Sequence, residues 1–396
     1  MTERLYYSDS YLTEFDATIT RVATHEGRPA VVLDRTAFYP TSGGQPFDTG
    51  RLGAVPVVDV VDADGGEILH VIDGELEPGA VHGRIDWARR FEHMQQHTGQ
   101  HVLSAAFDRV ASARTESFHL GSSSSTIDLN RTLSPADLDR AEEEANRVIW
   151  EDLPIGVRFA SAEEASALPL RKESIRTGTL RLIEVPGFDL SACGGTHVAR
   201  TGAIGAVVVA SSERFRGGTR VEFVCGVRAT RAYRTLRDTV AASVRLVSVL
   251  PAELPAGIER LQTETKDTKR TLKDLQSRLA TFEGVSLADR AEAFGGLRAV
   301  IAAVDGWDQN GLRALTAAII TRAGHVAALF TASSPSAAVI ARAPDVTIDC
   351  GLILKKLIER FGGKGGGRPD LAQGGGLQGS SDEIVASTRE IISTAT

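Results

Sequence analysis

The segment FEHMQQHTGQHVLSAAFDRVASA, residues 91–113, marks the point where the chain changes from strands to a helix. The spacing of its apolar residues fits a helix: Phe91, Met94, Leu103, Ala106 and Val110. Residues 1–90 instead consist of short β-branched runs separated by Gly, Pro and Asp, a pattern typical of strands and turns. We therefore expect a small β-barrel domain over residues 1–90, with a sandwich as the alternative, and then an α/β domain that begins with this helix.

The expected α/β domain, residues 91–228, is followed by a helical region. Within the domain, Ser134, Pro135 and Asp137 are typical of a capped helix start. Residues 229–285 are expected to form an antiparallel helical hairpin, and a coiled-coil dimer is the alternative. The observation behind both is an a/d seam whose members alternate at spacings of three and four residues: Ile258, Leu261, Thr265, Thr268, Leu272, Leu275, Leu279 and Phe282. A homodimer could form through this hairpin or through the C-terminal domain.

The last region, residues 286–396, is predicted to be a separate C-terminal α/β domain. The runs LRAVIAAVD, HVAALFTAS and SAAVIARAP are typical of strands, and CGLILKKLIERF is typical of a helix. The predicted fold class is therefore α/β, in an α+β arrangement of an N-terminal β-barrel, an α/β domain, a helical hairpin and a C-terminal α/β domain.

The composition is that of an ordinary globular chain with a modest negative charge. Of 396 residues, 42% are hydrophobic and 24% charged, which argues against wholesale disorder. Forty-four Lys and Arg against 51 Asp and Glu give a net charge of −7, which excludes a protein that coats nucleic acid with its whole surface but permits a local basic patch. Because the chain shows neither a secretory signal nor a long apolar run, we expect a cytoplasmic protein that does not bind membranes.

Two pairs of potential metal ligands have the same spacing. His97 and His101 lie one helical turn apart, and Cys193 and His197 occur in CGGTH. One thiolate and three imidazoles form a donor set that favours Zn²⁺. His93 lies on the same helical stripe, so spacing alone also permits His93 and His97 as the helical pair. A catalytic Cys193 with a His base is the competing chemistry, but metal ligation would occupy that thiolate.

Two further segments suggest ligand contacts. Ser42, Gly43, Gly44 and Gln45 form an expected turn between strands, which is either a plain glycine loop or a place where the backbone approaches a ligand closely. Near the C-terminus, five basic residues oppose only Glu359 within fourteen residues, which indicates either a solvated surface or a patch that contacts phosphates. These five are Lys355, Lys356, Arg360, Lys364 and Arg368.

Together, four motifs resemble the editing half of alanyl-tRNA synthetase and the free-standing AlaX-type editing proteins, in particular the long form. They are TAFYPTSGGQPFDTG (36–50), MQQHTGQHVLS (94–104), CGGTHV (193–198) and GGKGGGRPDLAQGGG (362–376), and they occur in the family's order. The resemblance runs from about residue 5 to the C-terminus, and implies that residues 286–396 are a DHHA1-type domain.

The resemblance also implies an activity and a set of site residues. The family's zinc ligands fall on His97, His101, Cys193 and His197, and its glycine-rich turn near the pocket matches residues 42–45. The implied reaction is hydrolysis of the ester that links serine or glycine to alanine tRNA, with this mischarged tRNA as the partner. Such a second sieve is needed because a pocket built for alanine discriminates only weakly against an added hydroxyl.

Further expectations follow from the same resemblance. Residues 115–121 lack the glutamine that synthetases often present to the substrate there, so Ser117 and His119 are the candidates for reading the serine hydroxyl. Apart from the resemblance, Glu184 and Asp189 lie just before CGGTH and are candidates for orienting a ligand histidine, with an ordinary exposed carboxylate as the alternative. In the C-terminal domain, Lys364 and Arg368 become tRNA contacts.

The chemistry of the metal has two alternatives at this stage. Four protein ligands are typical of a structural zinc, whereas three leave an open catalytic position. Because the chain starts at the editing-type barrel, we expect it to inspect alanyl-tRNA rather than to make it. The competing function is a non-catalytic, zinc-stabilised tRNA-binding module.

Overall fold

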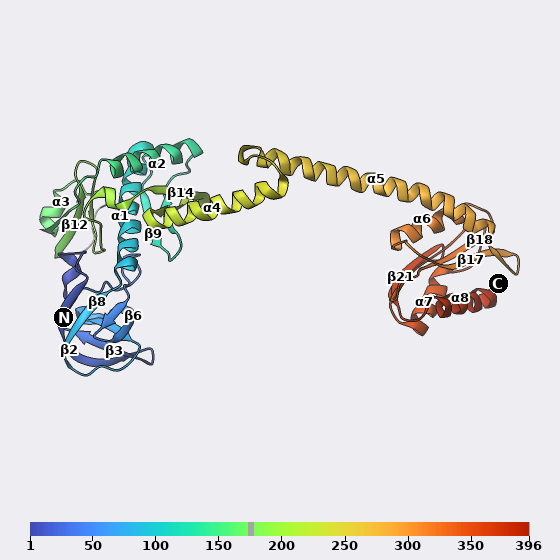
Figure 1. Ribbon diagram of the computed structural model, residues 1–396, viewed down its shortest axis with the longest axis horizontal. Helices are drawn as coiled ribbons and strands as arrows, with labels where there is room; N and C mark the ends of the chain where they lie inside the picture. The colour runs from blue at the N-terminus through green and yellow to red at the C-terminus, as the bar shows by residue number, and fades with distance from the viewer. Residues whose placement is uncertain (173–177, 396) are drawn as a thin grey trace. The chain divides into compact units, whose positions relative to one another are not determined.

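The computed structural model describes residues 1–172 and 178–395 (Figure 1). The chain divides into two compact units, Met1–Ala242 and Ser243–Thr396. The first unit covers the residues of both domains expected before residue 228, and their division at residue 90 stays a prediction. No single helix among the described residues is long and apolar enough to cross a membrane, and one bent pair of helices meets that test only by length and composition.

The expected N-terminal barrel is present as a closed, six-stranded sheet. Along β2 every second side chain from Phe15 to Ile19 is buried, as expected for a strand with one face toward a core. A short parallel pair, β1 (Glu3–Arg4) and β4 (Arg35–Thr36), lies beside it. In barrel order the strands are β2 (Glu14–His25), β3 (Arg28–Leu33), β7 (Ile68–Ile72), β6 (Val55–Asp62), β5 (Gly50–Leu52) and β8 (Gly79–Ile85).

Helix α1 (Trp87–Ala111) leads from the barrel into the rest of the first unit and is the element that the opening segment predicted (Figure 1). Asp86 caps its first turn, and nearly the whole stretch from His93 to Phe107 is buried. At Gly99 the helix passes so close to a neighbouring strand that a Cβ would lie 2.3 Å from the Cys225 sulfur. Glycine is therefore required at this position of the HTGQH motif.

The rest of the first unit surrounds α1 with two sheets and helices. Helix α2 (Pro135–Trp150) begins with the predicted cap, in which Ser134 and Asp137 exchange hydrogen bonds. One sheet has the order β14 (Val207–Phe215), β15 (Gly218–Cys225), β10 (Ser125–Leu129) and β9 (Thr115–Leu120). The other has the order β11 (Gly156–Ser161), β12 (Thr179–Val185) and β13 (Asp189–Ala192), with the short α3 (Ala162–Ser166) beside it.

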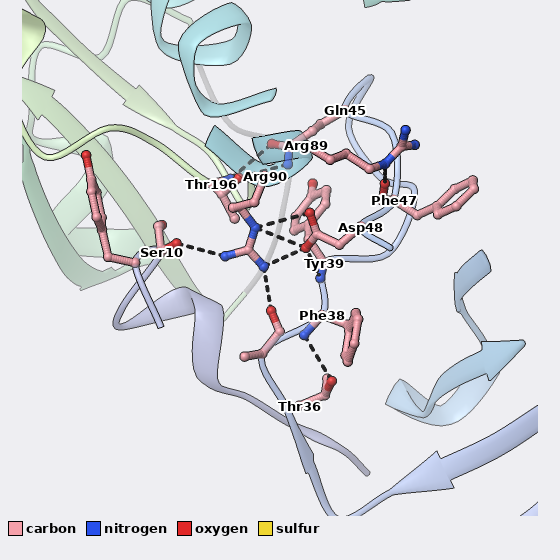
Figure 2. Close-up of polar contacts among 12 residues, drawn as sticks. Ser10, Thr36, Phe38, Tyr39, Gln45, Phe47, Asp48, Arg89, Arg90 and Thr196 are labelled. Carbon is pink, nitrogen blue, oxygen red and sulfur yellow. Dashed lines mark hydrogen bonds and ion pairs between the residues drawn. The ribbon is translucent and has the colours of Figure 1, made fainter. Parts of the chain in front are cut away.

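A buried ion pair joins the barrel to α1, as Figure 2 shows. Both Nε and Nη2 of Arg90 donate to the carboxylate of Asp48, the latter at 2.5 Å, and Arg90 also donates to the carbonyls of Ser10 and Ala37. The same carboxylate accepts from the backbone N–H of Tyr39. Asp48 thus anchors the loop of the 36–50 motif against the helix that carries two of the expected ligands.

The expected helical region consists of two α-helices, α4 (Gly226–Val247) and α5 (Leu254–Asp289), with a short break between them. The predicted seam lies on α5, where its leucines and Phe282 are exposed within the second unit. Pairing of this seam, either within one chain or between two copies, stays a prediction. The same holds for the domain limits 229–285 and 286–396.

The second unit contains the expected α/β fold around a six-stranded mixed sheet. Its two cores lie on opposite faces of the sheet, one against α7 and α8 and the other against α5 and α6. The strand order is β16 (Glu292–Phe294), β17 (Leu297–Val304), β18 (His325–Thr331), β19 (Ser336–Arg342), β21 (Leu371–Leu377) and β20 (Lys364–Arg368). The remaining helices are α6 (Gln309–Ile319), α7 (Cys350–Phe361) and α8 (Ser381–Ala395).

Candidate metal centre

The four expected ligands meet in one cluster, although nearly a hundred residues separate the two pairs. His97 and His101 come from α1, and Cys193 and His197 come from the loop after β13. One ligand atom from each lies within 4.8 Å of the others. The Cys193 sulfur is 3.3 Å from Nε2 of His97 and 3.3 Å from Nε2 of His197. One thiolate sulfur and three imidazole nitrogens are the type and number of donor atoms that Zn²⁺ takes in tetrahedral sites.

Each of the three imidazoles has a hydrogen-bond partner at its Nδ1 atom. His97 donates to the Gln45 carbonyl oxygen at 2.7 Å, and His101 lies 3.1 Å from a carboxylate oxygen of Asp189. Nδ1 of His197 is 3.2 Å from the Thr98 hydroxyl. Engaging Nδ1 leaves the Nε2 atoms to face the centre of the cluster, which is the usual arrangement around a metal. The residues therefore fit a bound zinc ion.

The electrostatics of the cluster also suit a cation. Burial would raise the pKa of the Cys193 thiol, but the charges of His97 and His197 lower it well below its usual value. Burial opposes a charge on His101, yet hydrogen bonds to Asp189 and Cys193 prevail and raise its pKa to about 9. Burial alone would raise the pKa of Asp189, but His101 and a neighbouring arginine lower it to about 2. A thiolate and a carboxylate are thus both maintained here.

The backbone of CGGTH is shaped by the same cluster. A Cβ at Gly195 would lie 2.0 Å from Cε1 of His97 and 3.0 Å from Oε1 of Gln45. No side chain fits there, so the second glycine of the motif is a packing requirement. Arg181 of β12 fixes this loop because its Nη1 donates to the carbonyls of Cys193 and Gly195, both within 2.9 Å.

A cavity of about 710 Å³ opens beside the cluster. His97, His101 and Cys193 line it, so the cluster borders this cavity. Four cationic residues and two carboxylates line its walls, a balance that suits an anionic ligand although the whole chain is acidic. They are Arg4, Arg171, Lys172 and Arg181 against Asp62 and Glu116.

The structure separates the residues of the 42–45 turn into different roles. Ser42 and Gly43 line the cavity. Gly44 packs against Phe118, where a Cβ would come within 2.8 Å of the ring. Gln45 is fully buried behind His97, and its amide also bonds Thr196. The expected backbone approach to a ligand stays a prediction for Ser42 and Gly43, whereas Gln45 bonds His97 and does not line the cavity.

The remaining candidates also differ in their positions. His93 lies outside the ligand cluster, so the structure brings together His97 and His101 rather than His93 and His97. Ser117 does not line the cavity and donates to Asp128, and His119 is exposed away from it.

The two carboxylates proposed to orient a ligand histidine also have different positions. Asp189 bonds His101, Arg171 and Ser191, whereas Glu184 is half exposed beside Arg158. Among the cavity residues that sequence reasoning missed, Gln100 and Tyr39 had a signal, their places inside the motifs 94–104 and 36–50, whereas Arg181 had none.

In the second unit, the five basic residues lie on α7 and β20. Lys355, Lys356 and Lys364 are exposed and have no ion pair among the described residues. Arg360 pairs with Glu390, and Arg368 pairs with Asp370. Their contact with tRNA stays a prediction.

Two family profiles match the chain. The threonyl and alanyl tRNA synthetase second additional domain matches residues 180–222, which include Cys193 and His197, and the DHHA1 domain matches residues 296–394. The chain therefore combines domains found in alanyl-tRNA synthetase.

Curated relatives specify the family further. An alanine–tRNA ligase from Natronomonas pharaonis is 36% identical over 99% of this chain, which spans only 44% of that ligase. The alanyl-tRNA editing protein AlaX-L from Pyrococcus horikoshii is 32% identical, and the match covers 94% of each chain. The chain belongs to the family of alanyl-tRNA editing proteins of the AlaX-L type.

Proposed function

We propose that this chain is a trans-editing hydrolase that removes serine or glycine from mischarged alanine tRNA. The name of the Pyrococcus horikoshii relative supports the editing of alanyl-tRNA, a step in the fidelity of translation. The observation that carries the hydrolytic proposal is the convergence of three Nε2 atoms and one thiolate at the wall of a cavity lined by cationic residues.

In this proposal the site holds Zn²⁺ through His97, His101, Cys193 and His197. A bound zinc ion would supply Lewis-acid polarisation or positioning of the aminoacyl ester next to the attacking water. The chain itself orients the ligand imidazoles through hydrogen bonds to their Nδ1 atoms and fixes the CGGTH loop through Arg181. The excess of cationic residues around the cavity attracts the phosphates at the tRNA 3′ end.

The test is a deacylation assay on alanine tRNA charged with serine, glycine or alanine. Wild type should hydrolyse the serine and glycine esters and spare the alanine ester, and His101→Ala should lose the activity together with the metal. His93→Gln is the matched control, because His93 lies one turn before His97 on α1 but outside the cluster. Tight tRNA binding without hydrolysis by wild type would instead establish the non-catalytic binding module.

A further inference from the structure

Three residues that line the cavity each contain a buried polar atom without a hydrogen-bond partner. Among the described residues, only six side chains contain such an atom, and Tyr6, Gln100 and Arg181 line this cavity. Buried polar groups in folded proteins are almost always paired. Three unpaired groups around one cavity therefore indicate that a polar ligand completes their bonding.

Gln100 is the one of the three that lies on α1, the helix that carries two histidines of the cluster. It precedes the ligand His101 on α1, follows His97 by three residues, and is 2% exposed. Its Nε2 donates to the Ser104 hydroxyl at 2.8 Å, and Thr115 donates to the same oxygen at 2.8 Å. This network holds one end of the amide, and Oε1 is left without a partner.

We propose that Gln100 Oε1 accepts the side-chain hydroxyl of the serine ester and is the residue that distinguishes serine from alanine. This inference rests on the proposed editing function. A neutral carbonyl oxygen suits a neutral hydroxyl, whereas the α-ammonium common to all three amino acids is better paired by a carboxylate, and Glu116 lines the same cavity.

The same geometry explains how alanine would be rejected. An alanine methyl group would cover Oε1 but could not donate a hydrogen bond to it. A buried acceptor left unpaired in this way weakens binding of the alanine ester by about 10- to 100-fold. Ser117 and His119 cannot take this role from their observed positions, because neither lines the cavity. Gln100 thereby fills the role for which residues 115–121 offer no glutamine.

The experiment compares kcat/KM of wild type and Gln100→Met on alanine tRNA charged with serine, glycine or alanine. Glycine has no hydroxyl, so it reports any general damage to the site. We expect Gln100→Met to lose about 10- to 100-fold on the serine ester and less than about threefold on the glycine ester. The preference for serine over alanine should fall by the same factor as the serine activity.

Gln96→Met is the matched control, since Gln96 is equally buried on α1 but bonds only the backbone of Cys225. It should leave the ratio of serine to glycine activity unchanged. Zinc content is measured for every variant. Gln100→Asn, which withdraws the acceptor but keeps an amide, should show the same selective loss and replaces Gln100→Met if that variant does not fold.

Three results would overturn the inference. Equal losses on serine and glycine esters would make Gln100 a structural residue, and unchanged activities would leave it without a role. A wild type that hydrolyses none of the three esters would instead overturn the proposed function, and the inference with it.

Discussion

Replacing Gln45 with methionine should weaken metal binding, although Gln45 is not itself a ligand. The side chain is fully buried and makes three hydrogen bonds. Oε1 accepts from His97 Nδ1 at 2.7 Å and from the Thr196 backbone N–H at 3.1 Å, and Nε2 donates to the Thr196 hydroxyl at 2.8 Å. Methionine has a similar volume, so the substitution removes the polar contacts without opening a large cavity.

The size of the effect follows from the groups that lose their partners. The Nδ1–H of His97 and the N–H of Thr196 remain buried without an acceptor, and each such group costs about 1–3 kcal/mol. Because His97 is then free to rotate or to change tautomer, zinc affinity should fall by about 10- to 100-fold, which is the usual consequence of removing a group that orients a ligand.

The assay is competition for Zn²⁺ between the protein and a chromophoric chelator, with urea unfolding followed in parallel. Gln96→Met serves as the control because it also removes buried hydrogen bonds from the first unit, in this case to the backbone of Cys225, without touching a ligand. It should lower the free energy of unfolding but leave the zinc affinity of the folded protein unchanged. Equal zinc affinities for the two variants would refute the role given to Gln45.

Two further predictions concern the barrel and the second unit. Burial lowers the pKa of His70 to about 4, so the unfolded chain binds a proton more readily between pH 6.5 and pH 4, and acid should destabilise the barrel. Between pH 6.5 and pH 5, His70 should lower the free energy of unfolding by about 2 kcal/mol. In urea unfolding, the stability of His70→Gln should therefore depend less on pH than that of wild type. Parallel curves of stability against pH would contradict this prediction. In the second unit, Lys364→Ala should reduce the salt slope of tRNA binding by ~0.7–0.9, since this lysine has no ion pair among the described residues. Arg360→Ala should change the slope less because Arg360 already pairs with Glu390, and anisotropy titrations at several salt concentrations that show no effect of Lys364 would remove the patch from the tRNA interface.

The buried Arg90–Asp48 pair gives the barrel a definite role in the proposed chemistry. Asp48 belongs to the same loop as Ser42 and Gln45, and Arg90 lies on the same helix as His97. The pair therefore fixes the position of the loop relative to the helix that carries His97. Removing one partner of such a pair leaves an uncompensated buried charge, which strongly destabilises the fold.

Local spacing was enough to identify the helix over residues 91–113, the cap at Ser134 and the pair Cys193 and His197. Each of these depends on neighbours three or four residues apart, whose geometry a helical turn or a tight loop sets directly. The choice of His97 and His101 over His93 and His97, by contrast, needed the family resemblance. The barrel and the C-terminal α/β domain could also be expected, because the strand pattern and its turns are local features.

Tertiary structure alone decided which side chains surround those ligands. Gln45 reaches His97 across 52 positions of the chain, and Asp189 reaches His101 across 88. Whether Glu184 or Asp189 faces the cluster depends on how β12 and β13 pack against α1, and whether Ser117 or Gln100 faces the cavity depends on the orientation of β9 and α1. Contacts between distant segments form only when the whole core packs, so the periodicity of apolar residues along the sequence does not predict them.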